Sequence, residues 1–163
     1  MNSKESIKPD IVMKEFWRVN ERFADLFNAV LFNGKNVIKS DMLKEMDTDI
    51  SGTIKWKKGQ SSLKRVRDIV KKEYDGVEFN ILGIEIQDKI HYAMPLRTMI
   101  YDGLGYLKEY NELKSKNRYT SGMTSDEFLS GMKKDDRLHP IITIVLYYSE
   151  MPWDGPVSIK DMM

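Results

Sequence analysis

The sequence predicts a mixed α/β (α+β) fold, in which a β-sheet is flanked by helices. Apolar residues recur at helical spacing between Phe16 and Leu31. Two runs rich in β-branched and aromatic residues, Val77–Gln87 and Ile141–Tyr148, indicate buried strands, and a long helix pattern separates them. This order of helix, strands, long helix and strand is typical of a mixed sheet with helices packed against it.

The length of the chain fits one domain. Its 163 residues can bury a substantial single core. Residues 1–13 are interpreted as a loose leader, so that the domain covers residues 14–163. Another helix pattern begins at the last residues, Asp161–Met163, and the sequence therefore indicates a form that lacks a C-terminal region.

The composition excludes several classes of protein. Hydrophobic residues make up 41% of the chain and charged residues 31%, which is typical of a globular domain. The absence of cysteine excludes disulfides, thiol catalysis and cysteine-bound zinc, and makes the reducing cytoplasm the expected location. No apolar run is long enough to cross a bilayer, so no membrane partner is expected. Because the net charge is only +1, binding to a nucleic acid would require a local basic cluster.

The first half of the chain is expected to alternate between helix, loop and strand. The first helix should end at Asn33-Gly34, and a brief helix should cover Ser40–Glu45. Residues 47–62 are polar and include two glycines, so we interpret them as a loop. Leu63–Lys72 would suit a helix as well, but we favour a strand over Val66–Val70.

The second half contains the clearest elements. A turn signal at Tyr74-Asp75-Gly76 precedes the strand Val77–Gln87, whose two apolar faces indicate a central, covered strand. Pro95 should begin the long helix, where its missing N–H costs little. Residues 115–123 are expected to form a polar loop, and Thr124–Glu127 a capping box ahead of a short helix.

Polar residues near the end of the central strand predict a metal site. Glu85 and Gln87 share one face of the strand, and a buried glutamate needs a partner or a bound cation. Antiparallel pairing would bring Asp68 toward the same end. Two close carboxylates repel unless a cation lies between them, and their oxygens suit Mg²⁺, with Mn²⁺ as a substitute. We therefore expect Asp68 and Glu85 to bind the metal, and Asp68→Ala to leave folding intact.

Basic residues gather around Asp68 in an otherwise balanced chain: Lys64, Arg65, Arg67, Lys71 and Lys72. A local positive patch of this kind suits the phosphates of a DNA backbone, and Lys64, Arg65 and Arg67 are the predicted contacts. The alternative is an ordinary exposed strand face, with Glu85 paired to Arg67 or Arg97.

Several segments, taken in order, resemble one known family: Asn20–Asn28, Arg67–Lys71, Gly83–Gln87, Met94–Arg97, Tyr101-Asp102, Ile141–Tyr148 and Pro152–Gly155. From residue 20 onward, the chain resembles the recombination-promoting nuclease or putative transposase family. That family is a branch of the PD-(D/E)XK nuclease superfamily.

The resemblance implies a restriction-endonuclease-like core (α-β-β-β-α-β) and Mg²⁺-dependent cleavage of DNA. It implies that Asp68 is the first metal-binding aspartate, Glu85 the acidic residue of the D/E-x-K element and Gln87 the residue in the place of its lysine. Glutamine is usual there in this branch, but it can only orient a group by hydrogen bonds, whereas lysine adds a positive charge. Arg67 and Arg97 are candidates for that charge.

The resemblance also brings helix residues into consideration. An acid of the first helix, Asp25 or Glu21, can join the metal shell in this superfamily, and the alternative is an exposed helix face. Arg97 and Tyr101 lie one helical turn apart, and they would either face the cleft and bind phosphate or form an ordinary helix edge.

The sequence therefore predicts a Mg²⁺-dependent endonuclease that hydrolyses phosphodiester bonds of DNA. The first alternative is a catalytically silent nucleic-acid-binding module on the same fold, which would bind DNA without nicking it. The second is a regulatory interaction domain, which would show no salt-sensitive DNA binding. The family is typically longer than this chain, and a homodimer is left open.

Overall fold

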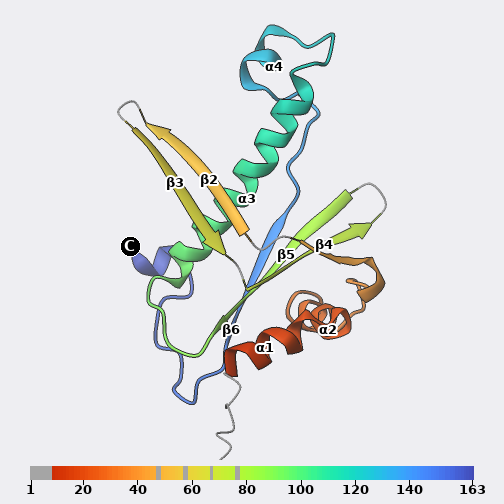
Figure 1. Ribbon diagram of the computed structural model, residues 1–163. Coiled ribbons are helices and arrows are strands. Elements are labelled where there is room, and N and C mark those ends of the chain that lie inside the picture. The colour runs from red at the N-terminus through yellow and green to blue at the C-terminus, as the bar shows by residue number, and fades with distance from the viewer. Residues whose placement is uncertain (1–8, 47–48, 57–58, 67, 76–77) are drawn as a thin grey trace, which may run out of the picture.

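The computed structural model describes residues 9–46, 49–56, 59–66, 68–75 and 78–163 (Figure 1). Its main sheet has the strand order β1 (Leu43–Glu45), β4 (Ile69–Asp75), β5 (Glu78–Gln87) and β6 (Ile141–Tyr147). Strand β4 is antiparallel to both β1 and β5, whereas β6 is parallel to β5. The prediction of a mixed sheet flanked by helices is confirmed.

Two helices, α1 (Pro9–Arg18) and α2 (Asn20–Phe32), cover one face of this sheet. The rings of Phe23 and Phe27 stack with their centroids 4.8 Å apart. Both rings are fully buried, and they pack with Leu82 and the other apolar residues on this face of β5. The i, i+4 spacing of the two phenylalanines, which the sequence pattern identified, therefore forms the centre of the core.

The beginning of the chain differs from the sequence prediction. Helix α1 begins at Pro9, so part of the leader expected over residues 1–13 is helical, and residues 1–8 lie outside the described ones. A proline in the first turn already has the helical φ angle, and an acidic neighbour favours the N-terminus of a helix. Met13 and Trp17 then pack against the core, so α1 is an integral part of the domain.

Helix α3 (Met94–Asn117) provides the crossover that a parallel pair of strands requires. It lies on the face of the sheet opposite to α2: Ile142 and Ile144 of β6 join the core under α2, whereas Thr143 donates a hydrogen bond of 3.0 Å to Asp102 of α3. Although α3 has 24 residues, no helix in the described ranges is both long and apolar enough to cross a bilayer.

Beyond the sheet, α3 continues toward α4 (Ser125–Ser130), which lies at the far end of the molecule (Figure 1). The capping box predicted from the sequence is confirmed. The Thr124 hydroxyl accepts from the backbone N–H of Glu127 at 3.3 Å, and the Glu127 carboxylate accepts from the backbone N–H of Thr124 at 2.8 Å. The connecting loop begins after Asn117 rather than at residue 115, because α3 is longer than expected.

The segment interpreted as a loop over residues 47–62 contains a hairpin instead. Strands β2 (Asp49–Trp56) and β3 (Gly59–Val66) pair antiparallel as a separate two-stranded sheet. The strand predicted over Val66–Val70 is accordingly divided, because β3 ends at Val66 and β4 begins at Ile69. A two-stranded ribbon satisfies its backbone groups without a continuous apolar run, which explains why its polar sequence resembled a loop.

After β6, the chain passes alongside α3 and ends in the short helix η2 (Ile159–Met162). The indole of Trp153 packs edge-on against Tyr147, with a centroid distance of 5.2 Å, and donates a hydrogen bond to the carbonyl of Gly155. A cavity of about 560 Å³ lies between this segment, α3 and β6.

A buried amide joins α2 to the segment that leads into the sheet. Asn28 is 5% exposed, its Nδ2 donates to the carbonyl of Ile38 at 2.8 Å, and its Oδ1 accepts from the backbone N–H groups of Val37 and Ile38. The helix η1 (Ser40–Met42) follows directly, and it is shorter than the helix expected over residues 40–45.

We predict that Asn28→Ala lowers the free energy of unfolding by about 2–3 kcal/mol, because buried backbone groups lose their partners. Urea titration monitored by circular dichroism would measure the change. Asn36→Ala, at an exposed position of the same connection, is the matched control and should change stability by less than about 0.5 kcal/mol. Equal stability of the two variants would contradict the assigned role of Asn28.

Candidate functional site

The first two candidate residues, Asp68 and Glu85, lie where β4 begins and β5 ends. In this antiparallel pair, Ile69 lies opposite Ile84. Asp68 directly precedes β4, and its Oδ2 accepts a hydrogen bond of 2.8 Å from the backbone N–H of Ile86. The predicted antiparallel pairing is therefore confirmed, and it brings Asp68 beside the strand end that contains Glu85.

The other oxygen of Asp68 binds a lysine from α1. Its Oδ1 lies 2.9 Å from Nζ of Lys14, which is also 2.9 Å from Oδ2 of Asp10 one turn earlier. Burial acts to lower the pKa of Lys14, but the bonds to Asp10 and Asp68 outweigh it, so the pKa is raised above the usual 10.5. Both carboxylate oxygens therefore have partners. The expectation that Asp68→Ala leaves stability intact is not supported, because the Ile86 N–H would lose its acceptor.

Lys14 was not identified from the sequence. The available signal was local: Asp10 and Lys14 are four residues apart and follow Pro9, which is the pattern of a helix start with an acid–lysine pair on one face. This pattern predicts the helix and its pair, but it does not predict that the helix lies against Asp68, because that contact joins segments 54 residues apart (68 − 14).

Glu85 is fully buried and is held by an arginine from α3. Its Oε2 lies 3.3 Å from Nη2 of Arg97, whose Nε donates to the hydroxyl of Tyr101 at 2.8 Å. Burial acts to lower the pKa of Arg97, but the bond to Tyr101 and the charges of Glu85 and Asp68 outweigh it, so the pKa of the guanidinium is raised. Arg97 and Tyr101 therefore face the candidate site, and the alternative pairing of Glu85 with Arg97 is observed.

Gln87, the third candidate, is half-buried at the end of β5. Its Nε2 donates a hydrogen bond of 2.8 Å to the carbonyl of Ile86. Its side-chain carbonyl can accept a hydrogen bond from a bound molecule. Glu85 and Gln87 therefore share one face of β5, as their two-residue spacing predicts. The amide N–H of Gln87, however, binds the backbone.

One member of the predicted basic patch is buried. Lys71 is 1% exposed, and its ammonium donates to the carbonyl of Arg18 and to Oδ1 of Asn20, at the junction between α1 and α2. Burial lowers the pKa of Lys71, although the carboxylates of Glu45 and Glu21 act in the opposite direction. Lys71 thus fastens α1 to the sheet and does not belong to a surface for phosphates.

The acids of the first predicted helix lie elsewhere. Glu21 and Asp25 are exposed on α2, and they line a separate cavity of about 630 Å³ together with Asn28 and Asp41. The alternative of an exposed helix face therefore describes them better than a place in the metal shell.

The remaining phosphate contacts are only partly described. Lys64 and Arg65 lie on β3 and their side chains are not described, and Arg67 lies outside the described residues, so their contact with DNA stays a prediction. Arg97 and Tyr101 line a cavity of about 350 Å³ together with His91 and Leu96. The Arg97 side chain is 31% exposed, so solvent reaches it.

Asp68 and Glu85 offer carboxylate oxygens, the donors that Mg²⁺ and Mn²⁺ prefer. Among the described residues, no three histidine, aspartate or glutamate side chains gather as a metal-binding group. A cation at this point would therefore keep several waters, as Mg²⁺ does when one or two carboxylates hold it. The chemistry of the two carboxylates fits such an ion, which would have to displace Lys14 and Arg97, whose side chains are each 31% exposed.

No family model, no curated protein and no solved structure matches this chain. Its function is therefore inferred from the side chains described above.

We predict a measurable coupling between Lys14 and Asp68 in a double-mutant cycle of Lys14→Met and Asp68→Asn. The side chains of Lys14 and Asp68 are 31% and 16% exposed, so the coupling energy should be about 0.5–1 kcal/mol in urea unfolding. Because the folded pKa of Lys14 is raised, this stabilisation is complete below pH 10.5 and is lost as the pH rises through the folded pKa.

The control cycle combines Lys14→Met with Asp41→Asn, an exposed acid of η1, and should be additive. If the two cycles gave the same coupling energy, Lys14 and Asp68 would not form the contact described here.

Proposed function

We propose that this chain is a Mg²⁺-dependent DNA endonuclease with a restriction-endonuclease-like core, of the recombination-promoting nuclease type. The observation that carries the proposal is that Asp68 binds the backbone of Ile86, next to Glu85 at the end of β5, with a basic side chain on each carboxylate. The strand arrangement supports it as well, because the antiparallel strands β1, β4 and β5, with the β2–β3 hairpin inserted after β1, and a helical crossover to the parallel strand β6 agree with the core that the resemblance implies.

Asp68 and Glu85 are the proposed metal ligands, for Mg²⁺ or for Mn²⁺ in its place. When bound, such a cation polarises the scissile phosphate and lowers the pKa of the attacking water. Gln87 accepts a hydrogen bond from that water and orients it toward phosphorus. The water oxygen would form the new P–O bond and give a proton to solvent, while the bond to the leaving sugar oxygen would break and that oxygen would take a proton from solvent.

Lys14 and Arg97 supply the positive charge that Gln87 lacks. In the described structure they neutralise the two carboxylates, and a divalent ion would take over that task. The released ammonium and guanidinium can then bind non-bridging phosphate oxygens, which carry negative charge in the transition state. Arg97 is the better placed for two parallel hydrogen bonds to phosphate, because its planar group has donors on two edges.

Two other functions remain distinguishable by experiment. A silent nucleic-acid-binding module would bind DNA through the same basic side chains but would not cleave it. A regulatory domain would neither bind nor cleave DNA. We expect the enzyme to act on DNA in the cytoplasm, in view of the absence of cysteine.

We predict that Asp68→Asn and Glu85→Gln each reduce Mg²⁺-dependent nicking of supercoiled plasmid by at least roughly a hundredfold, because an amide removes the ligand charge that holds the cation. Asp41→Asn is the control and should nick like the wild type. Unchanged nicking in both site variants would remove these residues from the site. DNA binding without nicking by any form, the wild type included, would favour the silent module.

Gln87 is tested by single-turnover cleavage at saturating Mg²⁺. We predict that Gln87→Ala slows the chemical step by about ten- to a hundredfold and leaves DNA affinity nearly unchanged, because one orienting hydrogen bond of about 1–3 kcal/mol is lost. Gln87→Lys should retain or raise the rate, since it adds a cation at the same position. A wild-type rate for Gln87→Ala would show that Gln87 is a bystander.

A further inference from the structure

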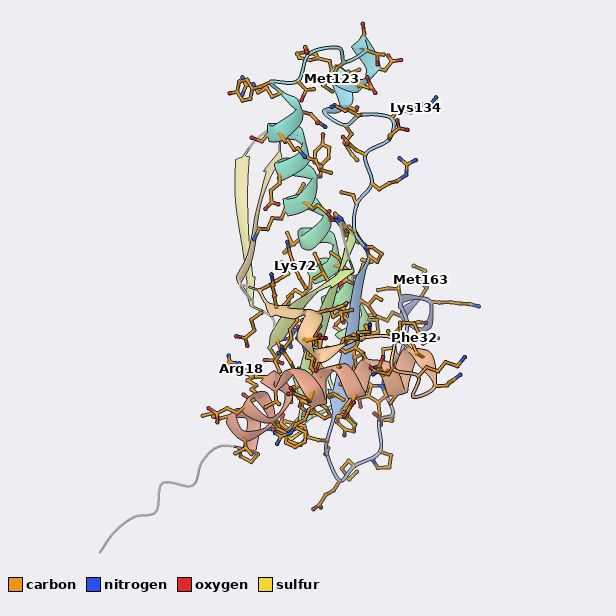
Figure 2. The ribbon with its side chains drawn as sticks, turned by 90° about the vertical axis from the view of Figure 1, so that its right-hand side faces the viewer. Arg18, Phe32, Lys72, Met123, Lys134 and Met163 are labelled. Carbon is orange, nitrogen blue, oxygen red and sulfur yellow. The ribbon has the colours of Figure 1, made fainter. Side chains whose placement is uncertain are left out.

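The far end of α3 and the segment around α4 form a projecting unit, which we call the tip (residues 110–137). In Figure 2, the labelled residues Met123 and Lys134 mark the tip, and they lie at the opposite end of the molecule from Arg18 and Phe32. The tip therefore extends away from the sheet that carries the candidate active site.

Internal hydrogen bonds hold the tip in one conformation. The hydroxyl of Tyr110 donates to the carbonyl of Ser130 at 2.7 Å. Asn117, which is 4% exposed, donates to the carbonyl of Gly131 at 3.2 Å and to the carboxylate of Asp136 at 2.6 Å. Gly131 has a φ of 76°, and a Cβ there would meet the side chain of Lys114, so this close approach requires glycine.

The tip carries large apolar and aromatic side chains that the rest of the chain does not cover. Tyr119 is 86% exposed, Phe128 73% and Leu129 84%. These three residues line a cavity of about 450 Å³, which is within the range of ligand-sized pockets. An exposed cluster of this kind on a rigid support indicates a surface for a partner.

The charges around this cavity select the kind of partner. Lys114 and Arg118 line it, and no acidic side chain among the described residues does. Within the described part of the chain, neither of these two cations has an ion-pair partner. Two acids of the tip accept backbone hydrogen bonds: Glu127 accepts from the N–H groups of Thr124 and Lys134, and Asp136 from that of Lys133. The cavity therefore combines aromatic rings with two cationic side chains, one of which, Lys114, also lies 5.6 Å from the ring centroid of Tyr110.

We propose that the tip binds single-stranded nucleic acid, with bases stacked on Tyr119 and Phe128 and phosphates bound by Lys114 and Arg118. Aromatic platforms beside basic side chains are the pattern by which proteins hold unpaired strands, since every base offers a π-face and every nucleotide a phosphate. A duplex does not fit this pattern, because its bases are already stacked on one another.

The tip then acts at a fixed distance from the candidate active site. Arg97 and Arg118 are 21 residues apart on α3 and its C-cap, which corresponds to about 31 Å at 1.5 Å per residue. At about 3.4 Å per nucleotide, this distance spans roughly nine nucleotides of a stacked strand. Binding of a single strand by the tip does not depend on the proposed function. Its consequence for cleavage does: if the chain is a nuclease, the tip directs it to DNA with an unpaired segment near the cleavage point.

The test is fluorescence anisotropy in EDTA, in which no metal-dependent cleavage occurs. The probes are a labelled oligothymidylate and a labelled duplex of the same length. For the double variant Tyr119→Ala/Phe128→Ala, we expect the affinity for oligothymidylate to fall by roughly tenfold or more, with little change for the duplex. Arg118→Gln should reduce the salt slope of oligothymidylate binding by about 0.7.

Matched controls are Tyr92→Ala, which removes an exposed aromatic residue far from the tip, and Lys35→Gln, which removes an exposed cation near the end of α2. Wild-type affinity for oligothymidylate in the double variant would overturn the inference, as would a folded wild type that binds no oligothymidylate at low salt. If the wild type nicks plasmid but the double variant binds oligothymidylate normally, the proposed function holds and this inference fails. If the double variant loses oligothymidylate affinity but the wild type does not nick plasmid, this inference holds and the proposed function fails.

Discussion

The burial of the Glu85 carboxylate is the constraint on which the rest of the structure depends. A fully buried charge costs far more than the domain can lose unless a cation compensates it, and among the described residues Arg97 of α3 provides such a cation. The salt bridge from Arg97 to Glu85 therefore joins α3 to the sheet, together with the hydrogen bond from Thr143 to Asp102. Tyr101, one turn later, holds the guanidinium in its orientation.

The same requirement explains α1. Asp68 meets the end of β5 through the N–H of Ile86, and its second oxygen needs a positive partner, which Lys14 provides. Lys71 of β4 fixes the C-terminal end of α1 by donating a hydrogen bond to the carbonyl of Arg18. Two helices from distant parts of the sequence thus each bring one cation to one of two neighbouring carboxylates. Under the proposed function, a divalent ion would replace both internal cations at once and would free two basic side chains for phosphate.

Much of this fold could be predicted from the sequence because its strongest patterns are periodic. The alternation in β5, the apolar run of β6 and the phenylalanine pair of α2 each gave the correct element, since burial on a sheet or helix face imposes those periods. The hairpin of β2 and β3 was missed, because a polar two-stranded ribbon has no such requirement. Helix α1 was missed because ten residues give too few repeats for a clear period.

Part of the candidate site could also be predicted from the sequence, because strand periodicity determines which side chains share a face. The spacing of Glu85 and Gln87 and the turn before β5 were enough to bring Asp68 to the correct strand end. The partner of Asp68 was not accessible, since the contact from Lys14 depends on how α1 packs and not on local sequence. Lys71 appeared to belong to a basic patch, because the sequence does not reveal that its strand position points into the α1–α2 junction.

The most direct measurement of the central claim is a crystal structure of the chain soaked in Mn²⁺, with anomalous scattering used to locate the ion. The account predicts an anomalous peak between the carboxylates of Asp68 and Glu85, at about 2.0–2.2 Å from their oxygens, with the Lys14 ammonium displaced from Asp68. A well-ordered site in which both salt bridges persist and no ion binds, at Mn²⁺ concentrations that saturate metal-dependent nucleases, would contradict it.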